Sequence, residues 1–205
     1  MQINLRSAVC GAYQENAYVV SLEGRDDCVA IDPGDDLDKL RAAIGDKKLA
    51  AILLTHGHFD HILAVGPLAE ATGAAVYVRE EDMEMLNDPE LNAYDPYAAT
   101  LPMPKGIAAV ALGKRVSAAG LDFTVIHTPG HSKGSCCFWL EDAGLLFSGD
   151  TLFCAGYGRM DLHGGSPLDM RNSLRGLFDL PGDVKVYPGH GGSTTIAREK
   201  ARYRL

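Results

Sequence analysis

The sequence predicts a layered α/β fold, in which two β-sheets carry helices on their outer faces. Strand-like apolar segments recur along the chain, and each strand-rich stretch closes with a helical pattern. The 205 residues include 46 % hydrophobic and 22 % charged side chains, which is ordinary for a globular protein. We therefore expect one domain, residues 1–205, with a core of useful size.

The first half of the chain alternates like strands from its start. The expected strands cover residues 2–9, 17–22, 28–31, 50–54 and 75–78. A DPGDD turn precedes a helix over 37–44, where Asp35 and Asp36 suit the positive N-terminal end. Pro67 fits the first turn of a second helix, which ends near Gly73.

The segment 87–106 contains four prolines and has no clean period, so it predicts a long surface loop. Its Tyr94 and Tyr97 either cover a substrate or belong to a mobile loop or a dimer contact. Further strands are expected at 121–127, 134–140, 145–148 and 184–187. Two helices are expected, one over 168–178 and one that begins after Ser193, with Ser193 or Thr194 as its cap.

Composition narrows the range of partners. The net charge of −8 argues against broad nucleic-acid binding, and the basic residues of 198–204 suit a solvated terminal helix. No apolar run approaches the ~20 residues of a membrane span, and the N-terminus lacks a signal-peptide pattern. The five cysteines are odd in number and lack CxxC spacing, which favours reduced, packed thiols, with Cys136 and Cys137 on opposite strand faces. We expect a cytoplasmic protein with no membrane or nucleic-acid partner.

The stretch THGHFDH concentrates His56, His58, Asp60 and His61 at the end of an apolar strand. A short loop there can aim several side chains at one point. Imidazole and carboxylate groups are ligands of zinc, iron and manganese. Four donors within six residues indicate more than one ion, because a tetrahedral catalytic ion usually takes three protein ligands plus water.

Three later segments supply further donors: HTPGHSKGS brings His131, FSGDT brings Asp150 and YPGHGG brings His190. In each case an apolar strand stops, small residues follow and a ligand-type side chain appears. Alone, each would be an ordinary loop or turn residue, but together with the first motif they indicate a metal centre. We expect His127 to pack or to support the site, and His163 has no assigned role.

These motifs resemble the metallo-β-lactamase fold superfamily, and within it the glyoxalase II (hydroxyacylglutathione hydrolase)-like group. The resemblance runs essentially end to end through ENAYVV, AIDPGDD, THGHFDH, HTPGHSKGS, FSGDTLF, GYGR and YPGHG. It implies an α/β fold of four layers, an αβ/βα sandwich of two mixed sheets flanked by helices. It also implies a dinuclear site along one edge of the sandwich.

The resemblance further implies that each ion has three ligands of its own and that one carboxylate bridges both: His56, His58 and His131 for the first ion, Asp60, His61 and His190 for the second, and Asp150 as the bridge. Asp32 would orient the ligands, although an Asp-Pro-Gly sequence can equally be only a turn. Asp60 and Asp150 are the candidate catalytic residues. Two divalent ions are expected, with zinc favoured over iron and manganese.

Two ions that share a water lower its pKa and polarise a carbonyl, so the site needs no Ser or Cys nucleophile. A thioester suits this chemistry because a thiolate leaves readily, with a pKa of about 8.5 for a free thiol. The resemblance thus implies a thioesterase that cleaves acyl-glutathione, such as lactoyl-glutathione, or a related thioester with a metal-bridging hydroxide. The expected partner is this small-molecule substrate.

The substrate is less well defined than the reaction. The chain stops soon after His190, so we expect a short form without the C-terminal helical domain that helps to grip glutathione. Its ARYRL ending also differs from the Asn-Pro ending expected of related sequences. Tyr157 and Arg159, in CAGYGRMD, are candidate substrate-binding residues. Arg159 either binds a substrate carboxylate or pairs with Asp161.

Other functions remain open at this level. A persulfide dioxygenase-like oxidoreductase would use one iron held by two histidines and an aspartate, and a lactonase-type hydrolase is a further alternative. β-Lactamase activity ranks lower because the signal peptide is missing, and nuclease activity because no RNA-binding insertion is evident. A complete ligand set argues against a non-catalytic metal-binding module. The oligomeric state is not predicted.

Overall fold

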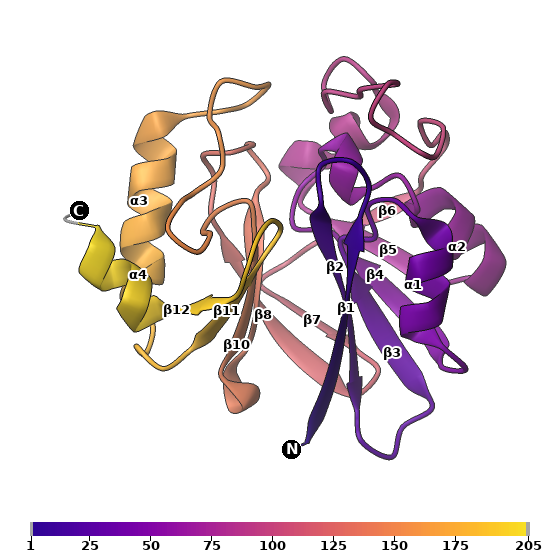
Figure 1. Cartoon of the computed structure of the whole chain (residues 1–205), viewed down its shortest axis with the longest axis horizontal. Helices are drawn as coiled ribbons and strands as arrows, with labels where there is room; N and C mark the ends of the chain where they lie inside the picture. Colours follow the sequence, from indigo (N-terminus) through magenta and orange to yellow (C-terminus); the bar gives the residue numbers. More distant parts are fainter. Residues whose placement is uncertain (1, 204–205) are drawn as a thin grey trace.

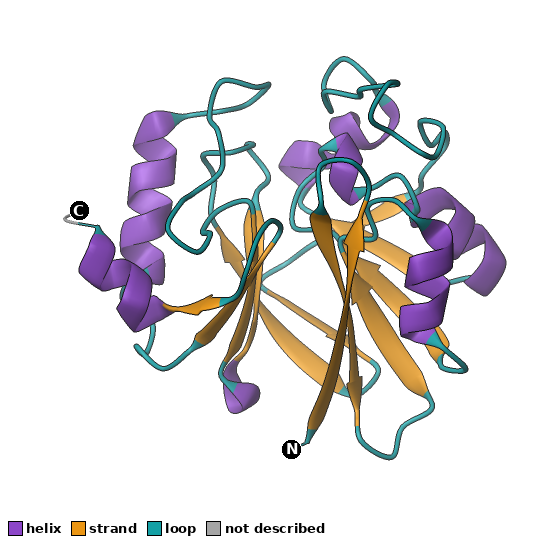
Figure 2. Cartoon of the chain, viewed as in Figure 1, coloured by secondary structure: helices purple, strands orange, loops and turns teal. Residues whose placement is uncertain are grey.

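Two six-stranded sheets lie face to face, and helices cover the outer face of each (Figure 1). The computed structural model describes residues 2–203. Both sheets are mixed, because each contains parallel and antiparallel strand pairs. The predicted αβ/βα sandwich is therefore confirmed, and Figure 2 shows its four layers from one side to the other.

The first half of the chain forms the first sheet and its helices. Its elements are β1 (Ile3–Cys10), β2 (Glu15–Leu22), β3 (Asp27–Ile31), α1 (Leu37–Ile44), β4 (Lys48–Leu53), the 3₁₀ helix η1 (Phe59–His61), α2 (Val65–Thr72), β5 (Ala75–Val78), the 3₁₀ helix η2 (Glu80–Asn87) and β6 (Ala109–Ala111). The strand order is β1-β2-β3-β4-β5-β6, so the two strands at the centre of this sheet are β3 and β4.

The second half forms the second sheet and its helices. Its elements are β7 (Arg115–Ala118), β8 (Leu121–His127), β9 (Cys136–Leu140), the 3₁₀ helix η3 (Glu141–Ala143), β10 (Leu145–Gly149), α3 (Pro167–Leu177), β11 (Lys185–Pro188), β12 (Thr194–Thr195) and α4 (Ile196–Arg202). The strand order is β12-β11-β10-β9-β8-β7. Among the described residues, no helix is both long and apolar enough to cross a bilayer.

The inner strands are apolar on both faces because each face packs against another layer. In β2, Val19 faces the core beneath α1 and α2, whereas Tyr18 and Val20 face the core between the sheets. In β9, Cys136 likewise lies between the sheets and Cys137 lies against the helices of the second sheet. The predicted opposite orientation of these two cysteines is confirmed.

The cysteines behave as packed thiols. Four of the five are buried, Cys154 is half-buried, and all five are free. Burial raises the pKa of Cys10 to about 12 and that of Cys137 to about 12, so both stay protonated at neutral pH. Neither is therefore a suitable nucleophile.

Several boundaries differ from the sequence predictions. β6, β7, β12 and η2 were not predicted, because each is short or lacks a clear period. The strand expected from residue 134 begins at Cys136, since Gly134 belongs to the preceding loop. The cap of α4 is Thr195, whose hydroxyl accepts a hydrogen bond from the Arg198 amide, rather than Ser193 or Thr194. Asp36 begins α1, but its side chain pairs with Lys39 instead of capping the helix.

Candidate metal centre

All seven predicted ligands lie in loops that follow strands, where the two sheets meet. The loop after β4 supplies His56, His58, Asp60 and His61; the β8–β9 loop supplies His131; and the loops after β10 and β11 supply Asp150 and His190. These loops gather at one edge of the sandwich, at the top of Figure 1. The centre is therefore shared between the two sheets, with four donors from the first and three from the second.

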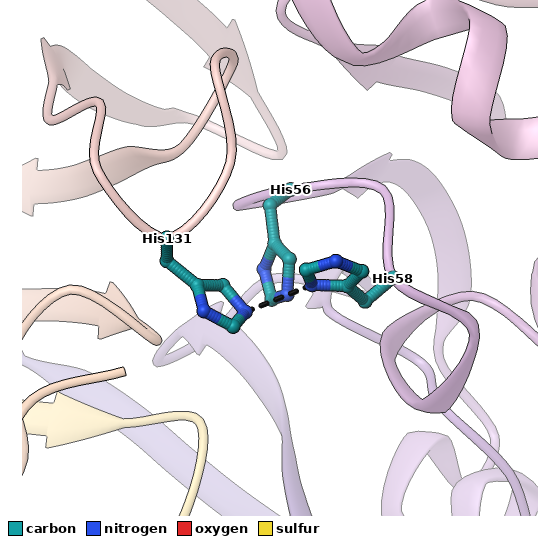
Figure 3. Close-up of side chains that lie close together, drawn as sticks. All are labelled: His56, His58 and His131. Carbon is teal, nitrogen blue, oxygen red and sulfur yellow. Dashed lines mark hydrogen bonds between the residues drawn. The ribbon is translucent and has the colours of Figure 1, made fainter. Parts of the chain in front are cut away.

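We call His56, His58 and His131 the three-histidine group. All three are buried, and one nitrogen of each lies within 4.8 Å of the others. His58 Nδ1 is 2.8 Å from His131 Nε2, a distance at which two ring nitrogens can share one cation or one proton. Figure 3 shows the rings converging from two separate loops.

Asp60, His61 and His190 form a second cluster, the mixed group, whose donor atoms also lie within 4.8 Å of one another. Asp150 lies between the two groups. Its Oδ1 is 3.4 Å from His61 Nε2, and its Oδ2 is 3.5 Å from His131 Nε2 and 3.6 Å from His190 Nε2. A carboxylate in contact with both groups has the placement expected of a bridge.

Hydrogen bonds fix the orientation of the ligand rings. Asp32 Oδ2 accepts from His61 Nδ1 at 3.1 Å and from the Thr55 hydroxyl at 2.6 Å. The Thr55 oxygen lies 3.0 Å from His56 Nδ1, so it can accept a bond from that ring. Asp32 thus orients two ligand rings, one of them through Thr55, and its backbone also adopts a turn conformation with φ of 47°.

The second sheet's histidines are held in the same way. His131 Nδ1 lies 2.7 Å from the Arg159 carbonyl, and His190 Nδ1 lies 3.0 Å from the Tyr13 carbonyl. In the neutral ring, an Nδ1–H that donates to its carbonyl leaves a lone pair on Nε2. In both rings that free nitrogen faces the cluster.

Several donor atoms of this centre have no hydrogen-bond partner in the described part of the chain, as expected of atoms that bind a metal. Within residues 2–203, several buried atoms lack a hydrogen-bond partner, among them His56 Nε2, His61 Nε2 and Asp150 Oδ1. An unpaired buried polar atom costs about 1–3 kcal/mol. Imidazole and carboxylate donors that converge without partners suit divalent cations.

Protonation states differ between the two groups. Burial and neighbouring histidines hold the pKa of His56 well below its usual range, and burial and His131 lower the pKa of His58 to about 3. Burial opposes charge on His61 as well, but Asp60 and Asp150 raise its pKa well above the usual range. Without metal, the His56 and His58 rings are therefore neutral, whereas the His61 ring holds a proton that a cation would displace.

A cavity of about 350 Å³ opens beside this centre. It is lined by Tyr13, His58, Phe59, Asp60, Asn92, Ala93, His131, Asp150, Phe153, Gly158, Arg159, Leu162 and His190. Arg159 is thus at the cavity, but its exposed guanidinium makes two bonds to Asp161, at 2.8 and 2.7 Å. Tyr157 does not line the cavity; its exposed ring lies against Tyr203.

The long loop contributes to the cavity wall through Asn92 and Ala93. The Tyr94 ring packs edge-on against the Phe59 ring, with 5.8 Å between the ring centroids, whereas Tyr97 is 99 % exposed. No helix or strand interrupts the chain between η2 and β6, as the four prolines predicted.

The remaining histidines lie outside the centre. His127 is exposed, so the expectation that it packs is wrong, and within residues 2–203 it makes no hydrogen bond to a candidate ligand; its ring bonds at 2.8 Å to the Lys133 carbonyl, in the loop that carries His131. Its position at the end of β8 lets the ring point to solvent. His163 lies 3.3 Å from Glu84 of η2.

Three polar residues near the centre were not singled out from the sequence: Thr55, Asp82 and Glu15. Thr55 directly precedes His56, which was a usable signal. Glu15 is fully buried, and neither of its carboxylate oxygens has a hydrogen-bond partner among residues 2–203. Burial raises the pKa of Glu15 well above its usual range.

Comparisons with known proteins agree on one family. A model of the metallo-beta-lactamase superfamily matches residues 10–190. A probable metallo-hydrolase of Bacillus subtilis, YqgX, is 34 % identical over 93 % of this chain and 91 % of its own. An uncharacterized Aquifex aeolicus protein is 35 % identical over 93 % of this chain and 91 % of its own. A hydroxyacylglutathione hydrolase of Pseudomonas aeruginosa is 37 % identical over 80 % of this chain but only 56 % of its own length.

Solved structures support the same grouping. BLEG-1 B3 metallo-beta-lactamase superimposes with a TM-score of 0.86 and 33 % identity, covering 97 % of both chains. TTHA1623, solved in a di-iron-bound form, superimposes with a TM-score of 0.85 and 38 % identity, covering 95 % of this chain and 96 % of its own. ETHE1 from Myxococcus xanthus superimposes with a TM-score of 0.73 and 29 % identity, covering 96 % of this chain and 81 % of its own.

Proposed function

Because the chain belongs to the metallo-beta-lactamase superfamily, we propose that it is a metal-dependent thioesterase of the glyoxalase II type. Its substrate would be acyl-glutathione, such as lactoyl-glutathione, or a related thioester. The family match supports a metallo-hydrolase, and the partial similarity to a hydroxyacylglutathione hydrolase supports the choice of substrate class.

The observation that carries this proposal is the lining of the cavity. Among the described residues, no serine, cysteine, threonine or lysine lines it, whereas five of the seven candidate metal ligands do. The hydroxyl, thiol and amine nucleophiles that usually attack acyl groups are therefore missing at this wall, and its carboxylates and imidazoles are the candidate metal ligands, which favours attack by water. Two bound divalent cations would lower the pKa of that water and polarise the carbonyl.

The chain's own carboxylates then handle the proton. Asp60 and Asp150 both reach the cavity, and the Asp60 side chain is the more exposed of the two, at 18 % against 10 %. Histidines keep both pKa values below the usual range although burial opposes this, so both carboxylates are ionised at neutral pH. We assign Asp60 as the group that accepts the proton of the attacking water.

The cavity lining offers few groups that could donate a proton to the leaving group, and this indicates which leaving groups suit the site. Apart from the metal ligands, its ionisable side chains are Tyr13 and Arg159, and the Tyr13 hydroxyl already donates to Asp95 at 3.3 Å. Apart from the candidate metal ligands, nothing in this lining is free to protonate a poor leaving group. A thiolate needs no such help, because a free thiol has a pKa of about 8.5. This favours a thioester over an amide or a lactam.

The test is a hydrolysis assay on lactoyl-glutathione and other acyl thioesters, with a lactone and a β-lactam in parallel and with metal content measured. We expect kcat/KM for a thioester to exceed that for the lactone and the β-lactam. A higher value for either of those would reject the thioesterase proposal while leaving a metallo-hydrolase.

Iron deserves a parallel assay, since TTHA1623 was solved in a di-iron-bound form. The second candidate is the function that the sequence left open, an oxidoreductase in which a single iron acts on a persulfide. Oxygen uptake with glutathione persulfide, in the absence of thioester hydrolysis, would favour that function instead.

A further inference from the structure

Asp82 is a buried carboxylate in η2, a segment that supplies no metal ligand. Its Oδ2 accepts hydrogen bonds from the Gly57 amide at 3.1 Å and from the Ser132 hydroxyl at 2.6 Å. Its Oδ1 accepts from the Gly134 amide at 2.6 Å. One carboxylate thus binds three donors that belong to two different loops.

Those two loops carry the three-histidine group. Gly57 lies between His56 and His58, and Ser132 directly follows His131. The first loop extends from the first sheet and the second loop from the second sheet, and they approach one another in Figure 3. Asp82 therefore connects the two halves of the molecule where these three rings must meet.

Both loops pack closely against η2 through a glycine. A Cβ atom at Gly134 would lie 2.6 Å from Asp82 Cγ, and a Cβ atom at Gly57 would lie 2.7 Å from Met85 Cβ. Real Cβ atoms do not approach so closely, so only glycine allows this contact at either position. The bonds of Asp82 are accordingly part of a close-packed junction rather than a contact between mobile side chains.

We infer that Asp82 is a positioning residue that sets the geometry of the three-histidine group. It makes no hydrogen bond to Asp60, His61 or His190. His190 lies on another loop and bonds to the Tyr13 carbonyl; Asp60 and His61 share the loop of Gly57 but follow it by three and four residues, and the His61 ring is held by Asp32. Removing the Asp82 carboxylate should therefore weaken metal binding by one group selectively. The inference rests on the metal centre proposed above but not on the choice of a thioester substrate.

The test measures metal affinity separately at each group. In a His190→Ala background the three-histidine group is the intact one, and in a His58→Ala background the mixed group is intact. Metal-free protein is titrated with Co²⁺ against a competing chelator. Partners that orient metal ligands typically contribute about 10–100-fold in affinity. We expect Asp82→Asn to weaken the three-histidine group by about 10-fold or more and to leave the mixed group unchanged.

Ser132→Ala removes only one of the three bonds and should give a smaller loss at the same group, which keeps the inference testable if Asp82→Asn does not fold. Asp35→Asn is the matched control. Asp35 is also buried and accepts bonds from the Asp36 and Thr100 amides, but it holds no ligand loop. It should leave both affinities unchanged.

Unchanged affinity at the three-histidine group in folded Asp82→Asn or Ser132→Ala would overturn the inference, as would an equal loss at both groups. An equally selective loss in Asp35→Asn would overturn it as well. Selective loss of metal in a protein that hydrolyses no thioester would support the inference and reject only the proposed substrate.

Discussion

Asp150 has carboxylate oxygens within 3.6 Å of histidine nitrogens in both ligand groups. We expect Asp150→Ala to reduce hydrolytic turnover by more than about 100-fold, because even indirect metal partners account for about 10–100-fold. Metal analysis of the same variant should show fewer bound ions than the unmutated protein. Near-normal turnover with a full metal complement would contradict the assignment of Asp150 as the bridge.

Arg159 lies at the cavity but is paired with Asp161. If Arg159 also binds a substrate carboxylate, Arg159→Ala should raise KM for a glutathione thioester roughly tenfold with little change in kcat, since the contact is similar in the ground and transition states. Asp161→Ala is the matched control, because it removes the ion pair and retains the guanidinium. Equal effects of the two variants, or equal losses with a thioester that lacks the carboxylate, would instead indicate that the pair only stiffens the loop.

The two ligand groups should respond differently to pH. Carboxylates raise the pKa of His61 and of His190 despite burial, so these rings keep their protons to higher pH than an ordinary histidine and lose them on metal binding. The pKa values of His56 and His58 are lowered, so those rings already are neutral. As pH rises through neutrality, metal affinity should therefore increase more at the mixed group. Calorimetry in buffers of different ionisation enthalpy, on His58→Ala and His190→Ala proteins, measures the protons released; equal release would contradict this prediction.

The sequence singled out the seven candidate ligands that the structure brings together, but of the residues that orient them it singled out only Asp32 for that role. His56, His58, Asp60 and His61 follow one another in a motif of types that bind metal, so local sequence was sufficient to single them out. Asp82 meets Ser132 only where the two sheets pack together, and its bond to Gly57 spans 25 residues without a periodic signal. Contacts of that kind depend on tertiary structure, which a single sequence does not reveal.

At the scale of elements, the long apolar runs were predicted well. α1 and β8 lie where the sequence placed them, because strong periodicity and flanking turns define both. The missed strands β6 and β12 have three and two residues, too short for an alternating pattern to appear. Their strand state comes from pairing with β5 and β11 rather than from propensity.

The long loop offers a direct comparison between two tyrosines. Tyr94 packs on Phe59, a cavity-lining residue, whereas Tyr97 is 99 % exposed. If the loop shapes the substrate site, Tyr94→Ala should raise KM several-fold and Tyr97→Ala should not, because only the first removes support from the wall. Steady-state kinetics on both variants decides this. Unchanged KM and kcat in Tyr94→Ala would show that the loop is not part of the substrate site.

At the scale of the whole molecule, the metal centre joins the two halves. Each ligand group combines side chains from both sheets: the three-histidine group takes His131 from the second sheet, and the mixed group takes His190. Separating the sheets would therefore break both groups at once. Bound metal should favour the packed state, since ligands that bind only the native form stabilise it.

This coupling predicts a large effect of chelation on thermal stability. An ion present at 1,000 times its Kd contributes about 4 kcal/mol to the free energy of unfolding. For a domain of this length, each 1 kcal/mol shifts Tm by about 2–4 °C, so removal of one ion should lower Tm by roughly 8–16 °C. Calorimetry with and without chelator measures the shift, and His190→Ala should show a smaller one because its mixed group is incomplete. If saturating metal leaves Tm unchanged, the ions do not bind the packed state in preference to the unfolded chain, and they do not hold the two sheets together.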